Sequence, residues 1–134
     1  MKYLSKGPAD TKKIAKKIFQ KHPDIRVFLL YGELASGKTT FAKGIAECLG
    51  LNGRLVKSPT FTFISEHPGL CHCDLYRLEA LDATIAESLK EHLESDTRLV
   101  IEWPDLLESQ ISTPHLKIKF THLGKNKRQI ESED

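Results

Sequence analysis

The chain has 134 residues, 40% hydrophobic and 28% charged, with a net charge of +2. This length predicts one domain spanning residues 1–134, and the composition excludes a disordered chain. No apolar run approaches the roughly 20 residues that cross a bilayer, and the N-terminus lacks an apolar signal core, so we expect a cytoplasmic protein with no membrane partner. Three scattered cysteines agree with a reducing compartment.

The first half of the chain alternates helical and strand patterns. Apolar residues at helical spacing predict a helix over 8–21. A continuous apolar run predicts a buried strand over 25–31, and a second helix is expected over about 38–49. An Asn-Gly pair at 52–53 predicts a turn into a short strand.

The second half is richer in strand patterns. Strands are expected over 60–67, 70–74, 98–103, 115–123 and 128–132, and a helix over 82–94. Because helices and strands alternate early while strands dominate late, the pattern predicts an α/β fold with a mixed sheet.

The segment after the first predicted strand has the spacing of a phosphate-binding loop. Residues 32–39 read Gly-x-x-x-x-Gly-Lys-Thr. In such a loop the backbone N–H groups surround phosphate oxygens, and the helix that follows adds its positive end. We expect Lys38 to reach the β- and γ-phosphates and the Thr39 hydroxyl to bind Mg²⁺. The expected nucleotide-binding residues are Gly32, Glu33, Leu34, Ala35, Ser36, Gly37, Lys38, Thr39 and Thr40.

Ala35 is the unusual residue of this loop. Glycine is common there because tight phosphate loops often need a positive φ, which costs alanine about 1 kcal/mol. We therefore expect nucleotide binding to survive, with either an unchanged or a lower affinity. The alternative is a strand-to-helix turn that binds nothing.

A nucleoside triphosphatase also needs carboxylates for its metal and its attacking water. Glu102 ends one predicted strand and Asp74 ends another. The pattern alone does not divide the metal and water roles between them.

Thr60 lies in a Ser-Pro-Thr segment that is either a γ-phosphate sensor or an ordinary loop. By itself, Trp103 is better explained as a packing residue.

Four segments carry a resemblance to a known family. They read GELASGKTTF (32–41), KSPTFT (57–62), HCDLYRLE (72–79) and VIEWP (100–104). In this order they resemble the motifs of the TsaE family, over about residues 8–120. Members of that family are small P-loop ATPases that help a partner enzyme form threonylcarbamoyladenosine beside the tRNA anticodon. The resemblance implies ATP and Mg²⁺ as cofactors, TsaD- and TsaB-type proteins as partners, and indirect contact with tRNA.

The resemblance also implies roles for particular residues. Lys38 would bind phosphates, Glu102 would join Thr39 at the metal, and Asp74 would act near the γ-phosphate as a catalytic group. Ala35 and Ser36 depart from the family pattern, which reads Gly-Ala there. The implied fold is a P-loop NTPase-like three-layer sandwich, with a mixed, mainly parallel sheet and late antiparallel strands. The other implied functional residues are Thr60, in a switch-like segment, and Trp103, a functional aromatic.

Several features are explained without a further site. On a strand, Cys71 and Cys73 point to one face and His72 to the other, so this segment is not expected to bind zinc. Lysines of the 8–21 helix are expected to form a solvated face. Arg77 either stabilises transition-state charge or pairs with a nearby acid.

Three other functions fit the chain less well. A small kinase usually needs an arginine-bearing lid, for which no long insertion is available. A GTPase generally carries Asn-Lys-x-Asp, whereas 126–129 reads NKRQ. A nucleotide-gated binding module without turnover would keep its function after Asp74→Ala. We expect an ATP hydrolase instead, slow alone and stimulated by partners, because no arginine finger is evident.

Overall fold

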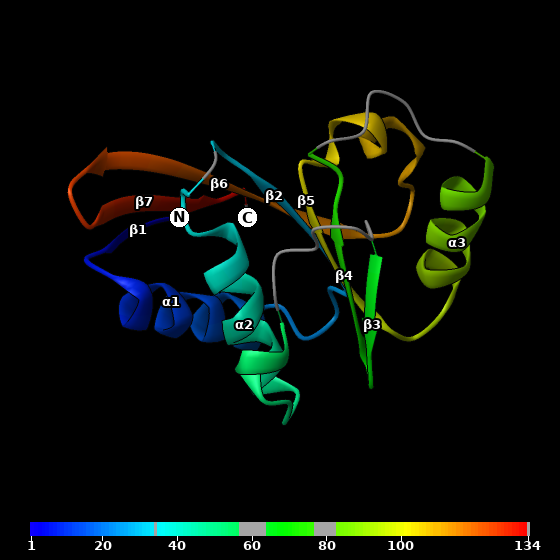
Figure 1. The fold of residues 1–134 in the computed structure, drawn as a ribbon, viewed down its shortest axis with the longest axis horizontal. Helices are drawn as coiled ribbons and strands as arrows, with labels where there is room; N and C mark the ends of the chain where they lie inside the picture. Colours follow the sequence, from blue (N-terminus) through cyan, green and yellow to red (C-terminus); the bar gives the residue numbers. More distant parts are fainter. Residues whose placement is uncertain (34, 57–63, 77–82, 134) are drawn as a thin grey trace.

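The computed structural model describes residues 1–33, 35–56, 64–76 and 83–133 (Figure 1). Short 3₁₀ turns cover Gly53–Leu55, Pro104–Leu106 and Glu108–Gln110. The helices are α1 (Pro8–Lys21), α2 (Lys38–Cys48) and α3 (Ala83–Glu94), and the strands are β1 (Lys2–Ser5), β2 (Val27–Tyr31), β3 (Ile64–His67), β4 (Leu70–Asp74), β5 (Arg98–Glu102), β6 (His115–Gly124) and β7 (Lys127–Ser132).

The described strands form one sheet in the order β1-β7-β6-β2-β5-β4-β3. Its centre is parallel, because β6, β2, β5 and β4 pair in the same direction. The edges are antiparallel: β7 pairs with β6 and β1, and β3 pairs with β4. The expected mixed sheet with a parallel centre and late antiparallel strands is confirmed.

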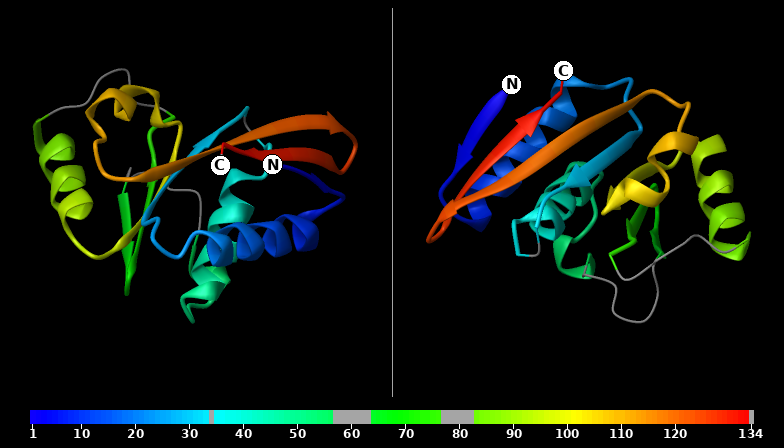
Figure 2. Two further views of the ribbon diagram at one scale, coloured as in Figure 1. Left: turned by 180° about the vertical axis from the view of Figure 1, so that it is seen from behind. Right: turned by 90° about the horizontal axis from the view of Figure 1, so that it is seen from above.

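Helices cover both faces of this sheet (Figure 2). Alternate residues of β2 point to opposite faces, so Phe28 and Leu30 join a core under α1 and α2, while Val27 and Leu29 join a core under α3. β5 behaves in the same way, since its apolar residues divide between the two cores. This alternation explains why both strands read as unbroken apolar runs. The three-layer arrangement expected from the sequence is confirmed.

Two local predictions differ from the structure. Asn52 leads into a 3₁₀ turn rather than a strand, because its side chain accepts a hydrogen bond from the Arg54 backbone N–H. β1 was not predicted, because its pairing partner β7 lies at the other end of the chain. The two termini meet there, and the Met1 ammonium donates to the Ser132 carbonyl at 2.8 Å. Among the described residues no helix is long and apolar enough to cross a membrane.

Candidate nucleotide-binding site

The register of the parallel strands brings the candidate site together. Asp74 at the end of β4 pairs with Glu102 at the end of β5. Glu102 in turn pairs with Leu30 of β2, two residues before the predicted phosphate loop begins. The carboxyl ends of parallel strands form the usual ligand-binding edge of an α/β sheet. Two acids and the loop therefore meet at one edge.

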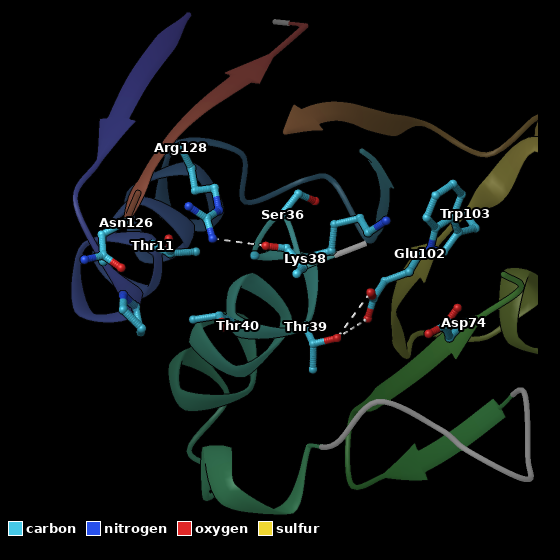
Figure 3. Close-up of a pocket in the computed structure, with 14 residues that line it drawn as sticks. Thr11, Ser36, Lys38, Thr39, Thr40, Asp74, Glu102, Trp103, Asn126 and Arg128 are labelled. Carbon is cyan, nitrogen blue, oxygen red and sulfur yellow. Dashed lines mark hydrogen bonds between the residues drawn. The ribbon is translucent and has the colours of Figure 1, made fainter. Parts of the chain in front are cut away.

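A cavity of about 320 Å³ opens at this edge (Figure 3). Asp74, Glu102 and Trp103 line one end of it, at the carboxyl ends of β4 and β5. The loop and the start of α2 form its floor. The floor residues are Ala35, Ser36, Gly37, Lys38, Thr39 and Thr40.

Residues that the sequence did not single out form the other end of the cavity. Thr11 comes from α1, Asn126 from the turn between β6 and β7, and Arg128 from β7 (Figure 3). In the sequence, Arg128 lies in a short basic segment together with Lys125 and Lys127. No local sequence signal marks this end, because it combines residues of α1 with residues of the β6–β7 turn and of β7, which lie far apart in the sequence.

The loop conformation needs a glycine at its start and tolerates an alanine later. A Cβ added to Gly32 would lie 2.8 Å from the Phe120 carbonyl oxygen and 2.9 Å from Ser36 Oγ, which leaves no room for a side chain. Ala35 adopts a left-handed φ of 59°. The positive φ expected at this position is therefore present, although the residue is not glycine.

Ser36 offers a buried polar atom inside the loop. Its side chain is 1% exposed, and Oγ has no hydrogen-bond partner among the described residues. A buried hydroxyl without a partner is unusual in folded proteins and calls for a ligand or an ordered water. Phosphate oxygens are strong acceptors, so this hydroxyl fits a phosphate group at the loop.

Lys38 is buried at the start of α2, at 4% exposure. Its ammonium donates to the Gly32 carbonyl and lies 3.6 Å from the centroid of the Trp103 ring. Burial lowers the Lys38 pKa from its usual value, and the nearby carboxylates of Glu102 and Asp74 oppose that shift. The ammonium thus lies in a partly desolvated site, where an anionic ligand is favoured.

The metal-site candidates form a connected chain of side chains. The Thr39 hydroxyl donates to both Glu102 carboxylate oxygens, at 3.0 and 3.2 Å. On its other side, Glu102 Oε2 lies 2.5 Å from His72 Nε2, and His72 is fully buried. His72 therefore orients the carboxylate, a role the sequence did not suggest. Cys71 and Cys73 lie in the core under α3, on the face opposite His72, as expected from strand alternation.

Asp74 lies beside the connected side chains of His72, Glu102 and Thr39, but a different contact orients it. Its Oδ1 accepts a hydrogen bond from the Tyr76 backbone N–H at 3.0 Å. Burial raises the pKa of Asp74 above its usual value, Tyr76 opposes the shift, and Glu102 adds to it. A carboxyl with a raised pKa is better suited to accepting a proton than one with an ordinary pKa.

These residues fit Mg²⁺ by the chemistry of their donors. A threonine hydroxyl and a carboxylate are hard oxygen ligands of the kind that Mg²⁺ prefers. Among the described residues no group of three or more His, Cys, Asp or Glu side chains surrounds a common point. Mg²⁺ usually keeps several waters and shares substrate phosphates, so one hydroxyl and one carboxylate are a sufficient contribution from the protein.

Apart from Trp103, the remaining predicted site residues either line a different cavity or lie outside the described residues. Glu33 and Gly32 line a second cavity on the other side of Trp103, so the structure does not place them in the first cavity. Leu34 and Thr60 lie outside the described residues, as does Arg77. Trp103 touches both cavities and contacts Tyr76, with ring centroids 4.9 Å apart.

Comparison with known proteins identifies the family. The profile described as threonylcarbamoyl adenosine biosynthesis protein TsaE matches residues 5–130. The chain belongs to the TsaE family. Its match to that family includes the phosphate loop, both strand-end acids and Arg128.

Individual relatives agree with this assignment. A Bacillus subtilis tRNA threonylcarbamoyladenosine biosynthesis protein TsaE is 39% identical over 97% of this chain and 83% of its own length. The protein of the same name from Treponema pallidum is 31% identical over 97% of this chain and 98% of its own length. The crystal structure of Bacillus subtilis YdiB has a TM-score of 0.74 at 32% identity, covering 97% of this chain and 82% of that one.

Proposed function

We propose that this chain is a Mg²⁺-dependent ATPase required for the threonylcarbamoyladenosine modification of tRNA next to the anticodon. The observation that carries the proposal is the Thr39–Glu102 hydrogen bond in the phosphate-loop cavity. This pairing joins the hydroxyl and the acid that a nucleoside triphosphatase uses at its metal. TsaE family membership supports the link to tRNA modification.

The reaction would be attack of water on the γ-phosphate, forming a bond from the water oxygen to phosphorus while the bond to the β,γ-bridging oxygen breaks. Lys38 would hold the β- and γ-phosphates, and the loop N–H groups would bind their oxygens. Mg²⁺, held through Thr39 and Glu102, would neutralise charge on the phosphates. Asp74 would orient the attacking water and accept its proton, which a raised pKa favours.

The partners of this ATPase would be TsaD- and TsaB-type proteins, and the chain would reach tRNA only through them. Hydrolysis by the isolated chain should be slow, since Arg128, the one described arginine that lines the cavity, lies at the end away from Asp74 and Glu102 and donates to the Ala35 carbonyl. A transition-state contact supplied by a partner can add roughly 10³- to 10⁵-fold to such a rate. Fast hydrolysis by the isolated chain would count against partner control.

Formation of threonylcarbamoyladenosine in a mixture of purified TsaD, TsaB and this chain tests the proposal. The wild type should support repeated turnover, and Asp74→Asn should not, although it keeps the acceptor for the Tyr76 N–H. The competing function is a nucleotide-gated binding module. It predicts that Asp74→Asn supports modification as well as the wild type, and that result would replace the ATPase proposal.

A further inference from the structure

Arg128 connects the far end of the sheet to the phosphate loop. Its Nη2 atom donates to the Ala35 carbonyl at 3.1 Å, over a sequence separation of 93 residues (Figure 3). Its Nη1 atom donates to the Lys127 carbonyl, also at 3.1 Å. The guanidinium therefore joins two backbone segments at the wall of the nucleotide cavity.

The Ala35–Ser36 peptide is held from both sides. Its carbonyl accepts from Arg128, and its N–H, which belongs to Ser36, donates to the Glu33 carbonyl at 3.3 Å. In a trans peptide the carbonyl and the N–H point in opposite directions, so these two bonds fix the orientation of the plane. Rotation of this plane would change the ψ angle of Ala35 and therefore the path of the backbone through the loop.

Ala35 needs such support because its φ is 59°. Glycine adopts this region readily, whereas alanine is disfavoured there by contacts of its Cβ. Arg128 is well placed to hold it, because β7 is the middle strand of a three-stranded unit. Arg128 pairs with Ser5 on one side and His122 on the other.

We propose that Arg128 is a positioning residue of the nucleotide site, which keeps Ala35 in the left-handed conformation that glycine would adopt by itself. This proposal rests on the proposed function, because it assumes that the loop binds phosphates. The side chain supplies from a distant strand what the loop sequence lacks. It also explains how the alanine is compatible with a formed loop.

A double-mutant cycle tests this role. The four proteins are wild type, Arg128→Gln, Ala35→Gly and the double variant, and the measurement is the dissociation constant of Mg²⁺-ADP by calorimetry. Arg128→Gln should weaken binding about five- to tenfold when residue 35 is alanine, because the loop then relaxes toward an ordinary φ. With glycine at 35 the same change should weaken binding by no more than about twofold.

Lys127→Gln is the matched control, because it removes one positive charge from the same strand without touching the loop. Its ADP affinity should equal that of the wild type. An equal loss from Arg128→Gln in both backgrounds would overturn the proposal, since Arg128 would then act on the nucleotide directly. No loss in either background would overturn it as well.

Amide hydrogen exchange at Ser36 separates this proposal from the proposed function. It needs no nucleotide, so it remains informative if the wild type fails to bind ADP. The Ser36 N–H should exchange several times faster in Arg128→Gln than in Lys127→Gln, because its peptide plane is no longer fixed. Equal exchange in the two variants would contradict the positioning role, whatever the outcome of the binding measurement.

Discussion

The Lys38 ammonium lies 3.6 Å from the centroid of the Trp103 ring, close enough for a cation–π contact. Trp103 is the only tryptophan of the chain. Its emission therefore reports on Lys38 without interference from another indole. Phosphates that draw the ammonium away from the ring should change that emission.

We predict that saturating ATP or ADP alters Trp103 fluorescence in the wild type. Lys38→Met should change the emission before nucleotide is added and should abolish the further change. Lys43→Met removes a charge from the same helix and should behave like the wild type. Calorimetric binding of nucleotide with no change in wild-type emission would show that Lys38 keeps its contact with Trp103.

Thr39→Val should remove most of the benefit that Mg²⁺ gives to nucleotide binding. Valine keeps the shape of threonine but lacks the hydroxyl, so both the metal ligand and the bond to Glu102 are lost. Losing an outer-shell partner of a metal ligand typically lowers metal affinity or activity about 10- to 100-fold, and losing the ligand itself should cost at least as much. Affinity for ADP should be measured with and without Mg²⁺, and Thr39→Ser should restore the difference. If Mg²⁺ increases the ADP affinity of Thr39→Val as much as that of the wild type, the metal binds elsewhere.

Asp74→Asn should increase stability while it removes hydrolysis. Burial raises the folded-state pKa of Asp74 above its usual value of 3.8, so folding disfavours the ionised form. The stability contribution of this carboxyl is therefore present below pH 3.8 and is lost as the pH rises through the raised folded value. At pH 7 the asparagine variant should have the higher free energy of unfolding, and the difference should shrink in acid. Hydrolysis should fall by about 10²-fold or more.

Urea unfolding of wild type and Asp74→Asn between pH 4 and pH 8 checks the stability part of this prediction. A wild type more stable than the variant at pH 7 would mean that the ionised Asp74 gains more from its neighbours than it loses by burial.

His72→Leu should affect both the fold and the metal site. Leucine leaves the buried Glu102 carboxylate without its 2.5 Å partner, which costs about 1–3 kcal/mol of stability. The Mg²⁺ dependence of nucleotide binding should weaken in the same variant. His72→Gln keeps a donor that can reach Glu102 and should recover part of both losses. A leucine variant with wild-type Mg²⁺ dependence would show that His72 only fills the core.

The sequence predicted the centre of this fold because the relevant signals are local. The β2 and β5 runs are apolar on both faces, and the loop spacing joins a strand to a helix. The carboxyl ends of parallel strands meet at one edge of a sheet. The positions of Asp74 and Glu102 at strand ends therefore also predicted that both acids lie near the loop. These conclusions needed no knowledge of which strands are neighbours.

The parts that could not be predicted depend on contacts between distant segments. His72 was considered only as a zinc ligand, because nothing in its surroundings reveals that it meets Glu102, 30 residues later. Arg128 reaches the loop through the β6–β7 hairpin, whose direction no local pattern specifies. β1 spans only four residues and is stabilised as a strand by pairing with β7.

Mg²⁺-dependent ATP hydrolysis by wild type and Glu102→Gln, alone and with TsaD and TsaB, tests the central claim most directly. Glutamine keeps the size of the side chain and an acceptor for Thr39 but removes the charge that the metal needs. The account predicts slow hydrolysis by the wild type, stimulation by the partners, and loss of both in Glu102→Gln. Nucleotide binding without hydrolysis in any mixture, or hydrolysis that Glu102→Gln leaves unchanged, would contradict it.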